Sequence, residues 1–373
     1  MSRYPYLPGS VWNRLHRVIG LQRLGHEVYV VEELAPMRCV DRAGRQCDFA
    51  QCVNRQLFAA TMCRFGLMER ACQIYNCGED TFGLSLASLA AVARDADLLI
   101  NVSGHMATEA VLHTVKRRVY VDEDPVYTQL WHAVYGEDLN FKMHDIFFSV
   151  GLNIGTPYTP IPDCGIKWHP LLPPVILDYW PFRIVPSCRR FTTLASMSSF
   201  EDLRYRGERY RSKAEEFKRF AALPRKITQE IEVALSPDSK HAKTIRRLRE
   251  NHWIVSEASQ IDSLSRYQKF IAQSRAELGI AQNAYVKAHS GWFSDRSAHY
   301  LASGRPVLAQ STGFERWLPS GQGLLTFKTL QEAVAGIEAI NSKYAAHCRA
   351  AREFAAEYLD YRKVLPKFLE ECS

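Results

Sequence analysis

The sequence predicts an α/β protein of two domains, each built around a doubly wound parallel sheet. The chain has 373 residues, of which 47% are hydrophobic, so it can bury two cores. Helical stretches alternate with short, continuously apolar strands in both halves, which is typical of parallel sheets covered on both faces. A proline-rich stretch without periodicity, residues 154–186, separates the two series.

The first half opens on a helix rather than on a strand. Apolar residues recur at helical spacing from Val11 to Ile19, and Gly25 ends that helix. A doubly wound domain usually begins with its central strand, but Pro5 and Pro8 oppose strand pairing here. Either the sheet does without that strand or the true start lies upstream. The later elements expected are strands at 28–30, 98–102 and 119–121, with a helix through residue 92.

The second half repeats the alternation. We expect strands at 190–196, 230–236, 253–257, 285–287 and 305–310, and helices at 207–223, 240–251 and 261–273. The stretch 330–371 is almost continuously helical, with breaks near Asp360 and Pro366. The predicted first domain covers residues 1–186 and the second covers 187–345. Residues 346–373 are expected to pack back on the first domain.

Composition narrows the classes of function. The net charge is +7, and basic residues are densest at 204–226 and 240–249, which favours anionic ligands in general over nucleic acid as partners. No stretch reaches the roughly 18 apolar residues of a membrane span, and no signal-peptide core is present, so we expect a cytoplasmic protein. The ten cysteines lack zinc spacing, which predicts reduced thiols and no metal site.

One stretch has the composition of an anion-binding loop, HSGWFSDRSAHYLASGRPVLAQSTGF at 289–314. Gly291 lets the backbone approach a ligand closely, and Ser294 can cap the helix that follows. Arg296 is a fork-shaped donor to phosphate oxygens, and Ser297 can donate its hydroxyl. The simpler interpretation is that Ser294 only caps the helix and Arg296 is solvated.

This stretch belongs to a longer resemblance. Residues 267–314, together with LPSGQGLLTF, resemble the donor-binding domain of a bacterial family of GT-B glycosyltransferases, similar to glycosyltransferase family 1. The family has the signature SGWFSDRS…YLA.GRPV..Q.TGF. The segments GLQRLGHEVYVVE and VYVDEDPVYTQLW resemble its acceptor-binding domain. The resemblance implies two Rossmann-like domains facing across a cleft, with C-terminal helices crossing back.

The resemblance also implies a reaction. A sugar moves from a nucleoside-diphosphate sugar, with UDP as the expected nucleotide, to an unidentified hydroxyl acceptor. No metal or other cofactor is expected, so protein groups must compensate the charge that develops on the diphosphate. The expected diphosphate ligands are Gly291, Ser294, Arg296 and Ser297, with Lys213 and Arg211 from the helix after the first strand of the second domain.

The donor sugar and ribose are expected to contact His299, Ser311, Thr312, Gly313 and Phe314. Two of these depart from the related patterns. His299 stands where the superfamily often has a glutamate, and it can instead simply pack on its helix. Ser311 stands where family members typically have an aspartate, which puts sugar choice in doubt.

An inverting reaction needs a general base. Asp122 and His105 lie in loops that follow predicted strands, and Asp124 is close to Asp122. Acidic residues ahead of Pro125 also form turns, and a lone histidine in a loop is often structural. A retaining reaction needs neither group.

Three other interpretations were weighed. A dinucleotide-dependent oxidoreductase is disfavoured because no GxGxxG joins a first strand to a helix. A non-catalytic nucleotide-sugar-binding homologue or partner subunit is suggested by His299 and Ser311. A DNA-modifying glycosyltransferase is suggested by the positive charge, although no basic stripe with interleaved aromatics is evident. The nucleobase, sugar, acceptor, stereochemical outcome and oligomeric state stay open.

Overall fold

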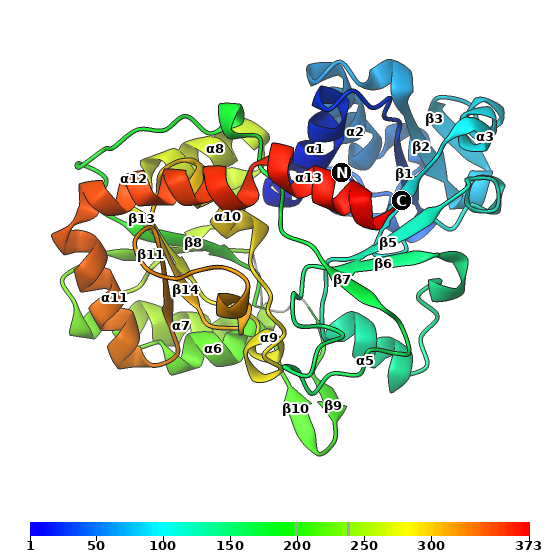
Figure 1. Ribbon diagram of the computed structural model, residues 1–373. Coiled ribbons are helices and arrows are strands. Elements are labelled where there is room, and N and C mark those ends of the chain that lie inside the picture. Colours follow the sequence, from blue (N-terminus) through cyan, green and yellow to red (C-terminus); the bar gives the residue numbers. More distant parts are fainter. Residues whose placement is uncertain (198–199, 237–238) are drawn as a thin grey trace.

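The computed structural model describes residues 1–197, 200–236 and 239–373. Figure 1 shows two α/β lobes side by side, with helices around parallel strands in each. We call the lobe with strands β1 to β7 the first lobe. The second lobe contains β8 and β11 to β15, and a short hairpin, β9–β10, projects where the lobes meet.

The second lobe is built on one sheet of six parallel strands in the order β12-β11-β8-β13-β14-β15. The chain places β11 and β12 on one side of β8 and β13 to β15 on the other, so the strand order reverses between β8 and β13. Ligands bind beyond the carboxyl ends of strands at such a reversal. The strands are β8 Phe191–Ala195, β11 Ile231–Leu235, β12 Ile254–Glu257, β13 Ala276–Gly279, β14 Val307–Gln310 and β15 Leu324–Phe327.

Helices cover both faces of this sheet because its strands are apolar on both sides. All four residues of β13 and of β14 are buried. The covering helices are α6 Lys213–Arg219, α7 Ala242–Glu250, α8 Leu264–Gln273, α9 Asn283–Lys287, α10 Asp295–Ala302 and α11 Leu330–Ser342.

The first lobe begins with helix α1, Pro8–Arg23, where a proline at the start costs no backbone hydrogen bond. No strand precedes α1 in the described part of the chain, and the strands form two sheets, β1-β2-β3 and β4-β5-β6-β7. The strands are β1 Val30–Leu34, β2 Ala71–Tyr75, β3 Asp80–Gly83, β4 Leu99–Val102, β5 Arg118–Asp122, β6 Ile146–Ser149 and β7 Trp168–Pro170. The further helices are α2 Val53–Arg64, α3 Leu86–Asp95, α4 Glu109–Leu112 and α5 Tyr127–Ala133.

Two stretches of the second lobe fold otherwise than predicted. The expected strand at 285–287 is part of helix α9, and β13 takes that place in the sheet. The expected helix after Gly207 begins only at Lys213, because Glu208–Tyr210 pairs antiparallel with Leu203–Tyr205 as the hairpin. Periodicity alone does not separate a short apolar strand from a turn of buried helix.

The chain crosses back to the first lobe at its end, as predicted. Helix α12, Tyr344–Phe354, packs against α10, and helix α13, Tyr361–Glu371, packs against α1. The predicted break near Asp360 is confirmed, since its side chain caps α13. The predicted break at Pro366 is wrong, because this proline lies inside α13, whose packing outweighs one lost backbone bond. The domain boundaries at 186 and 345 stay predictions.

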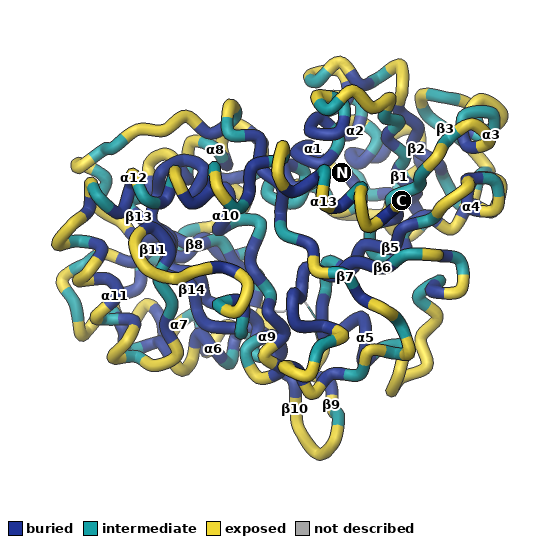
Figure 2. Tube along the Cα trace, in the orientation of Figure 1, coloured by how far each residue is buried: buried dark blue, intermediate teal, exposed yellow. Residues whose placement is uncertain are grey.

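The lobes share an apolar core. Trp12 and Leu15 on α1 belong to the same buried cluster as Tyr267 on α8 and Leu301 on α10. Figure 2 shows this junction buried, whereas the tip of the hairpin is exposed. The lobes are therefore joined by hydrophobic burial as well as by the connecting chain.

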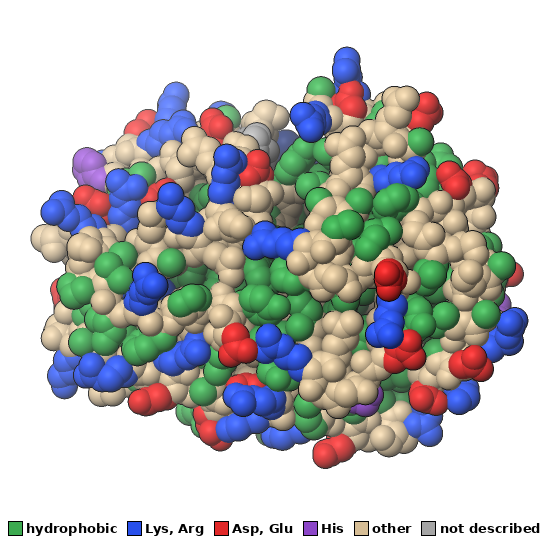
Figure 3. Space-filling model, turned by 90° about the horizontal axis from the view of Figure 1, so that it is seen from above, with side chains coloured by type: hydrophobic (Ala, Val, Ile, Leu, Met, Phe, Trp, Pro, Cys, Tyr) green, Lys and Arg blue, Asp and Glu red, His purple; other side chains and the backbone are tan. Residues whose placement is uncertain are grey.

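The surface charge is dispersed. Figure 3 looks onto one face and shows Lys and Arg side chains scattered over the second lobe among acidic ones, without one continuous stripe. The ten cysteines form no disulfide, and all of them lie in the described ranges. Within those ranges, none of the helices combines the length and apolarity that crossing a membrane requires.

Candidate functional site

Arg296 lies where the strand order of the second sheet reverses. Helix α10 starts beside it, and Ser294 caps this helix as predicted, its Oγ accepting a hydrogen bond from the Arg296 N–H at 3.2 Å. The Arg296 Nε donates to Glu277 Oε1 of β13 at 2.6 Å, and Nη1 donates to the Leu194 carbonyl of β8 at 2.9 Å. The guanidinium thus spans the ends of the two strands that flank the reversal.

Lys213 adds a second buried cation. It is the first residue of α6, and its ammonium lies 6.0 Å from the centre of the Trp292 ring. Burial and, to a smaller extent, the positive charge of Arg296 together lower the pKa of Lys213 to about 7. Among the described residues, none forms a hydrogen bond or ion pair with this ammonium. A buried cation without a carboxylate partner is expected where an anionic ligand supplies the charge.

A small cavity opens beside Arg296 at the ends of β13 and β14, and Lys213 is not among the residues that line it. It brings together four of the predicted donor-site residues, Ser294, Arg296, Ser297 and Phe314. The complete lining is Gly279, Ala281, Trp292, Phe293, Ser294, Arg296, Ser297, Ala309, Gln310 and Phe314. The cavity has a volume of only about 10 Å³, room for about one water molecule. Its lining still combines an aromatic wall, a helix N-terminus and a guanidinium, groups that can bind a phosphate.

The loop ahead of α10 is fastened to the first lobe by Asn153, which follows β6. The Asn153 Nδ2 donates to the carbonyl of His289 at 2.7 Å and to that of Gly313 at 3.3 Å. The Asn153 backbone N–H donates to the Ser290 carbonyl at 3.0 Å, and its Oδ1 accepts from the Trp317 indole at 2.9 Å. One fully buried side chain of the first lobe thus holds both loops of the donor site.

The close contact with Asn153 requires glycine at two positions of the predicted site. Gly291 has φ of +75°, and a Cβ there would lie 2.7 Å from the Asn153 backbone nitrogen. Gly313 has φ of +91°, and a Cβ there would lie 2.7 Å from the Asn153 Nδ2. Both positions need glycine for backbone conformation and for the approach of the first lobe. A close approach by ligand, the reason given from sequence for Gly291, is not required to explain it.

The other predicted residues of the loop after β14 mainly contact the protein itself. The Thr312 hydroxyl donates to the Trp292 carbonyl at 2.6 Å, and the Thr312 carbonyl accepts from the Gly291 N–H at 2.8 Å. The Phe314 ring packs edge-on against Phe293 at 5.2 Å. Ser311 is also buried, and its backbone N–H bonds to β15. These groups brace the Arg296 loop from behind.

His299 lies in the junction between the lobes. It is 1% exposed, stacks on Trp180 at 4.5 Å, and its Nδ1 is bonded to the Tyr267 hydroxyl at 3.0 Å. Burial lowers the pKa of His299 well below its usual value. This position supports the packing interpretation over a ribose contact, because stacking and hydrogen bonding already occupy the ring.

The carboxylate oxygens of Asp122 are fully engaged in hydrogen bonds within the protein, so they cannot also bind the hydroxyl of an acceptor substrate. It is fully buried and accepts hydrogen bonds from Thr128 Oγ1 at 2.6 Å, Gln129 Nε2 at 3.0 Å and Ser149 Oγ at 2.7 Å, and from the Asp124 backbone. This is a structural arrangement that fixes the β5 loop. The candidate for proton transfer shifts from Asp122 to Asp124 for this reason.

Asp124 is partly open, and no side-chain hydrogen bond to it occurs among the described residues. Burial and, to a smaller extent, the neighbouring carboxylates of Asp122 and Glu123 together raise the pKa of Asp124 to about 7. A carboxyl group with this pKa can exchange protons near neutral pH. His105 is less suited, because burial, with Arg3 and Arg14, lowers its pKa to about 3.

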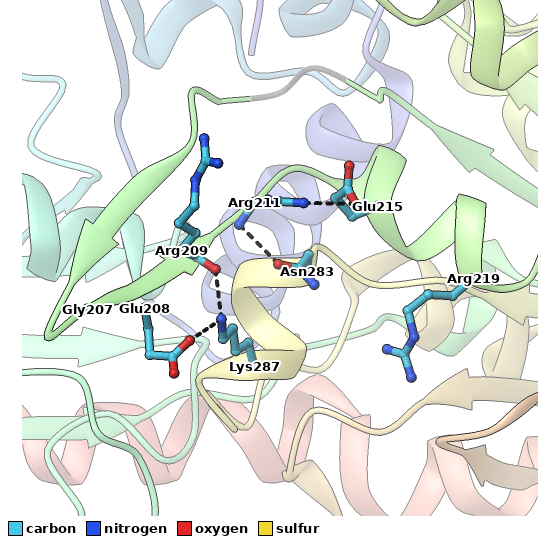
Figure 4. Close-up of a pocket in the computed structure, with 8 residues that line it drawn as sticks. All are labelled: Gly207, Glu208, Arg209, Arg211, Glu215, Arg219, Asn283 and Lys287. Atoms are coloured by element: carbon cyan, nitrogen blue, oxygen red, sulfur yellow. Dashed lines mark hydrogen bonds and ion pairs between the residues drawn. The ribbon is translucent and has the colours of Figure 1, made fainter.

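The side chains of Arg211 and Lys213 lie in different surroundings, although only Ser212 stands between them in the sequence. Its guanidinium pairs with Glu215 at 3.2 Å and lines a second cleft of about 450 Å³, shown in Figure 4. This cleft shares no lining residue with the cavity beside Arg296. The structure therefore brings together only some of the predicted diphosphate ligands.

Sequence reasoning missed Glu277 and Asn153. Glu277 lies in the strand that was not predicted. Asn153 comes three residues after Val150, just beyond the carboxyl end of β6, and polar residues at strand ends could have been searched there. Across the described ranges there is no group of three or more His, Cys, Asp or Glu side chains placed to hold a metal ion.

Comparison with known proteins gives the fold. An alpha-glucosyltransferase in complex with UDP-glucose and DNA containing an abasic site is 13% identical, with a TM-score of 0.58, over 98% of this chain and 95% of that chain. Anabaena Alr3699/HepE in complex with UDP and glucose is 13% identical, with a TM-score of 0.57, over 96% and 95%. A glycosyltransferase from Rickettsia africae ESF-5 is 11% identical, with a TM-score of 0.52, over 96% and 92%.

The chain has the GT-B fold. The prediction of two Rossmann-like lobes with crossing C-terminal helices is confirmed by these likenesses and by the topology. No family model and no curated protein matches the sequence. Identities this low carry the fold but not the substrate, so the function is argued from the site.

Proposed function

We propose that this protein is a glycosyltransferase that uses a nucleoside-diphosphate sugar as donor and a hydroxyl group as acceptor. The observation that carries the proposal is the pair of buried cations, Arg296 and Lys213, at the strand reversal. One of them has no anionic partner among the described residues. Similar folds occur in proteins solved with UDP-glucose and with UDP and glucose, and these support UDP-glucose as the first donor to test.

The chemistry follows from the placement of charge. The bond between the anomeric carbon and the phosphate oxygen breaks, and its electron pair stays on the diphosphate. Arg296, Lys213 and the N–H groups at the start of α10 stabilise that charge. The acceptor oxygen bonds to the anomeric carbon, and Asp124 takes the proton that the hydroxyl loses.

Transfer without a metal is part of the proposal, because Arg296 and Lys213 can supply the positive charge that a metal ion would otherwise bring to the diphosphate. In protein kinases and related enzymes the same neutralisation comes from bound magnesium. We expect a chelator to leave the rate of donor turnover unchanged. A rate that requires added divalent cation would contradict this part.

The experiment is a panel of nucleotide sugars, scored for thermal stabilisation and for hydrolysis of the donor. We expect one nucleoside diphosphate to stabilise the protein and its sugar conjugate to be hydrolysed slowly. Asp124→Asn should keep the stabilisation but slow turnover by about 100-fold or more. Asp122→Asn, which alters a buried structural carboxylate, should instead lower stability. Stabilisation by no member of the panel would exclude the proposed function.

A further inference from the structure

The second cleft has no role in the reaction described above. It lies between the hairpin β9–β10, α6 and α9, and four cationic side chains line it together with two acidic ones. The complete lining is Gly207, Glu208, Arg209, Arg211, Glu215, Arg219, Asn283 and Lys287. Figure 4 shows Arg211 beside Glu215 and Lys287 beside Glu208, with the charged ends of Arg209 and Arg219 directed away from these pairs. Its volume of about 450 Å³ accommodates a phosphate group and its substituents.

The cations of this cleft remain accessible. The side chains of Arg209 and Arg219 are 47% and 51% exposed, and Lys287 is 37% exposed. The Arg209 guanidinium has only a distant acidic partner, Asp202 at 3.7 Å. Arg219 pairs with the buried Glu216 at 2.5 Å, and Lys287 pairs with the exposed Glu208. Long ion pairs at exposed positions contribute little, so Arg209 is the cation that can most readily exchange its partner for an anionic ligand.

The hairpin is fixed in place, and it lies beside the first lobe. The Arg204 backbone N–H donates to the Tyr135 hydroxyl of the first lobe at 2.9 Å, and the Arg211 carbonyl accepts from the Tyr127 hydroxyl at 3.3 Å. Lys287 Nζ donates to the Arg209 carbonyl at 3.2 Å. The cleft is therefore a built feature at the junction of the lobes, on the same helix α6 whose first residue is Lys213.

We propose that this cleft binds a phosphate group of the acceptor, and that the acceptor is a phosphodiester-linked chain. Arginine forks match phosphate oxygens in pairs. Arg204 and Arg206 extend the positive charge along the hairpin beyond the cleft, which suits a repeated anion better than a single one. The inference rests on the proposed function, since it assigns the acceptor of that reaction.

The test uses a short single-stranded oligonucleotide as a soluble phosphodiester chain, with binding followed by fluorescence anisotropy over a range of salt concentrations. The variant is Arg209→Gln with Arg219→Gln. Glu216, which Arg219 contacts, keeps its bonds from Gln310 and Asn283. The matched control is Lys243→Gln with Arg246→Gln on exposed α7, which removes the same charge from the same lobe.

We expect the cleft variant to bind the oligonucleotide about tenfold more weakly, with a salt slope lower by roughly 1.4, the value for two lost phosphate contacts on a single strand. The α7 control should change affinity by less than about twofold. Competition by inorganic phosphate only at far higher concentration supports a chain over free phosphate.

Three results would overturn the proposal. They are equal losses in both variants, unchanged binding in the cleft variant, or binding to phosphatidylglycerol vesicles without binding to the oligonucleotide. A parallel titration of UDP-glucose distinguishes failure of the cleft proposal from failure of the proposed function. Loss of the cleft proposal leaves UDP-glucose binding intact, whereas failure of the wild type to bind any nucleotide sugar removes the proposed function itself.

Discussion

Arg296 is oriented before any ligand arrives. Two of its donors are engaged, by Glu277 and by the Leu194 carbonyl, and no described residue accepts from its Nη2. Glu277 is fully buried, and its second carboxylate oxygen has no partner among the described residues. The guanidinium is therefore held in one direction while part of its fork is left for an anion, which is the arrangement of a preorganised site.

The buried charge of Lys213 lowers the free energy of unfolding of the ligand-free protein, so replacing Lys213 should stabilise the fold. Burial lowers the pKa of Lys213 to about 7, so the folded state binds this proton less tightly than the unfolded state does. The cost is greatest below pH 7 and vanishes near the usual lysine pKa of about 10.4. Lys213→Met should raise the free energy of unfolding by about 1–2 kcal/mol at pH 7, measured by chemical denaturation. The gain should shrink toward pH 10, and a gain that grew with pH would refute this cause.

The protonation of Lys213 should also make nucleotide binding depend on pH. A diphosphate requires the protonated ammonium, whose pKa lies at about 7 in the protein alone. Affinity for UDP should fall as pH rises from 7.5 to 9, by up to about tenfold per pH unit. Calorimetric titrations at several pH values measure this fall. In Lys213→Met the curve should be flat, and an equal fall in that variant would assign the effect to another group.

At the scale of elements, Asn153 couples the lobes through two loops. The segment after β6 bonds to the loop before α10 and to the loop after β14. A Cβ at Gly291 would lie closest to the Asn153 backbone nitrogen, at 2.7 Å, and 3.0 Å from the Asn153 Cγ. A Cβ at Gly313 would lie closest to the Asn153 side-chain Nδ2, at 2.7 Å. The two glycines thus differ in what a compensating change can relieve.

This difference gives a double-mutant test. Gly313→Ala and Gly291→Ala should each destabilise the protein by about 1–3 kcal/mol, from backbone strain and the clash with Asn153. Adding Asn153→Ala should partly relieve Gly313→Ala, because the side chain that it meets is gone. It should give Gly291→Ala less relief, since the Asn153 backbone nitrogen at 2.7 Å remains and only the Cγ contact at 3.0 Å is removed. Unfolding free energies of all variants measure the coupling, and equal relief at both glycines would contradict the geometry.

At the scale of the molecule, the continuous core predicts joint unfolding. Trp12 of the first lobe shares one buried cluster with Tyr267 and Leu301 of the second. Calorimetry should show a single transition for both lobes. Trp12→Ala, which leaves a large cavity in that cluster, should lower stability by about 3–5 kcal/mol. Two separated transitions in the wild type would show that the lobes unfold independently.

Much of this architecture could be predicted because it depends on local pattern. The strands at 230–236 and 305–310 are apolar runs between polar turns, and both are confirmed as β11 and β14. Ser294 as a cap is equally local. The turn of α9 was mistaken for a strand because its five residues, of which three are apolar, carry too little periodicity.

The remaining parts of the site depend on contacts between distant residues. Nothing near Asn153 in the sequence indicates that it meets His289 and Gly313. Arg211 and Lys213 look equivalent in sequence, but Arg211 lines the second cleft, whereas Lys213 starts α6 and its ammonium is buried near Trp292. His299 stands where the resemblance predicts a donor contact, yet Trp180 and Tyr267 reach it from far along the chain. These pairings appear only once the lobes are assembled.

The most direct measurement is a calorimetric titration of UDP into the wild type, Arg296→Ala and Lys213→Met. Both variants should bind at least about tenfold more weakly, since each loses a charge-assisted contact to phosphate. Lys213→Met is informative even if Arg296→Ala disturbs the fold, because no described residue bonds to that ammonium. Binding of UDP by both folded variants at wild-type affinity would contradict the assignment of the diphosphate to the strand reversal.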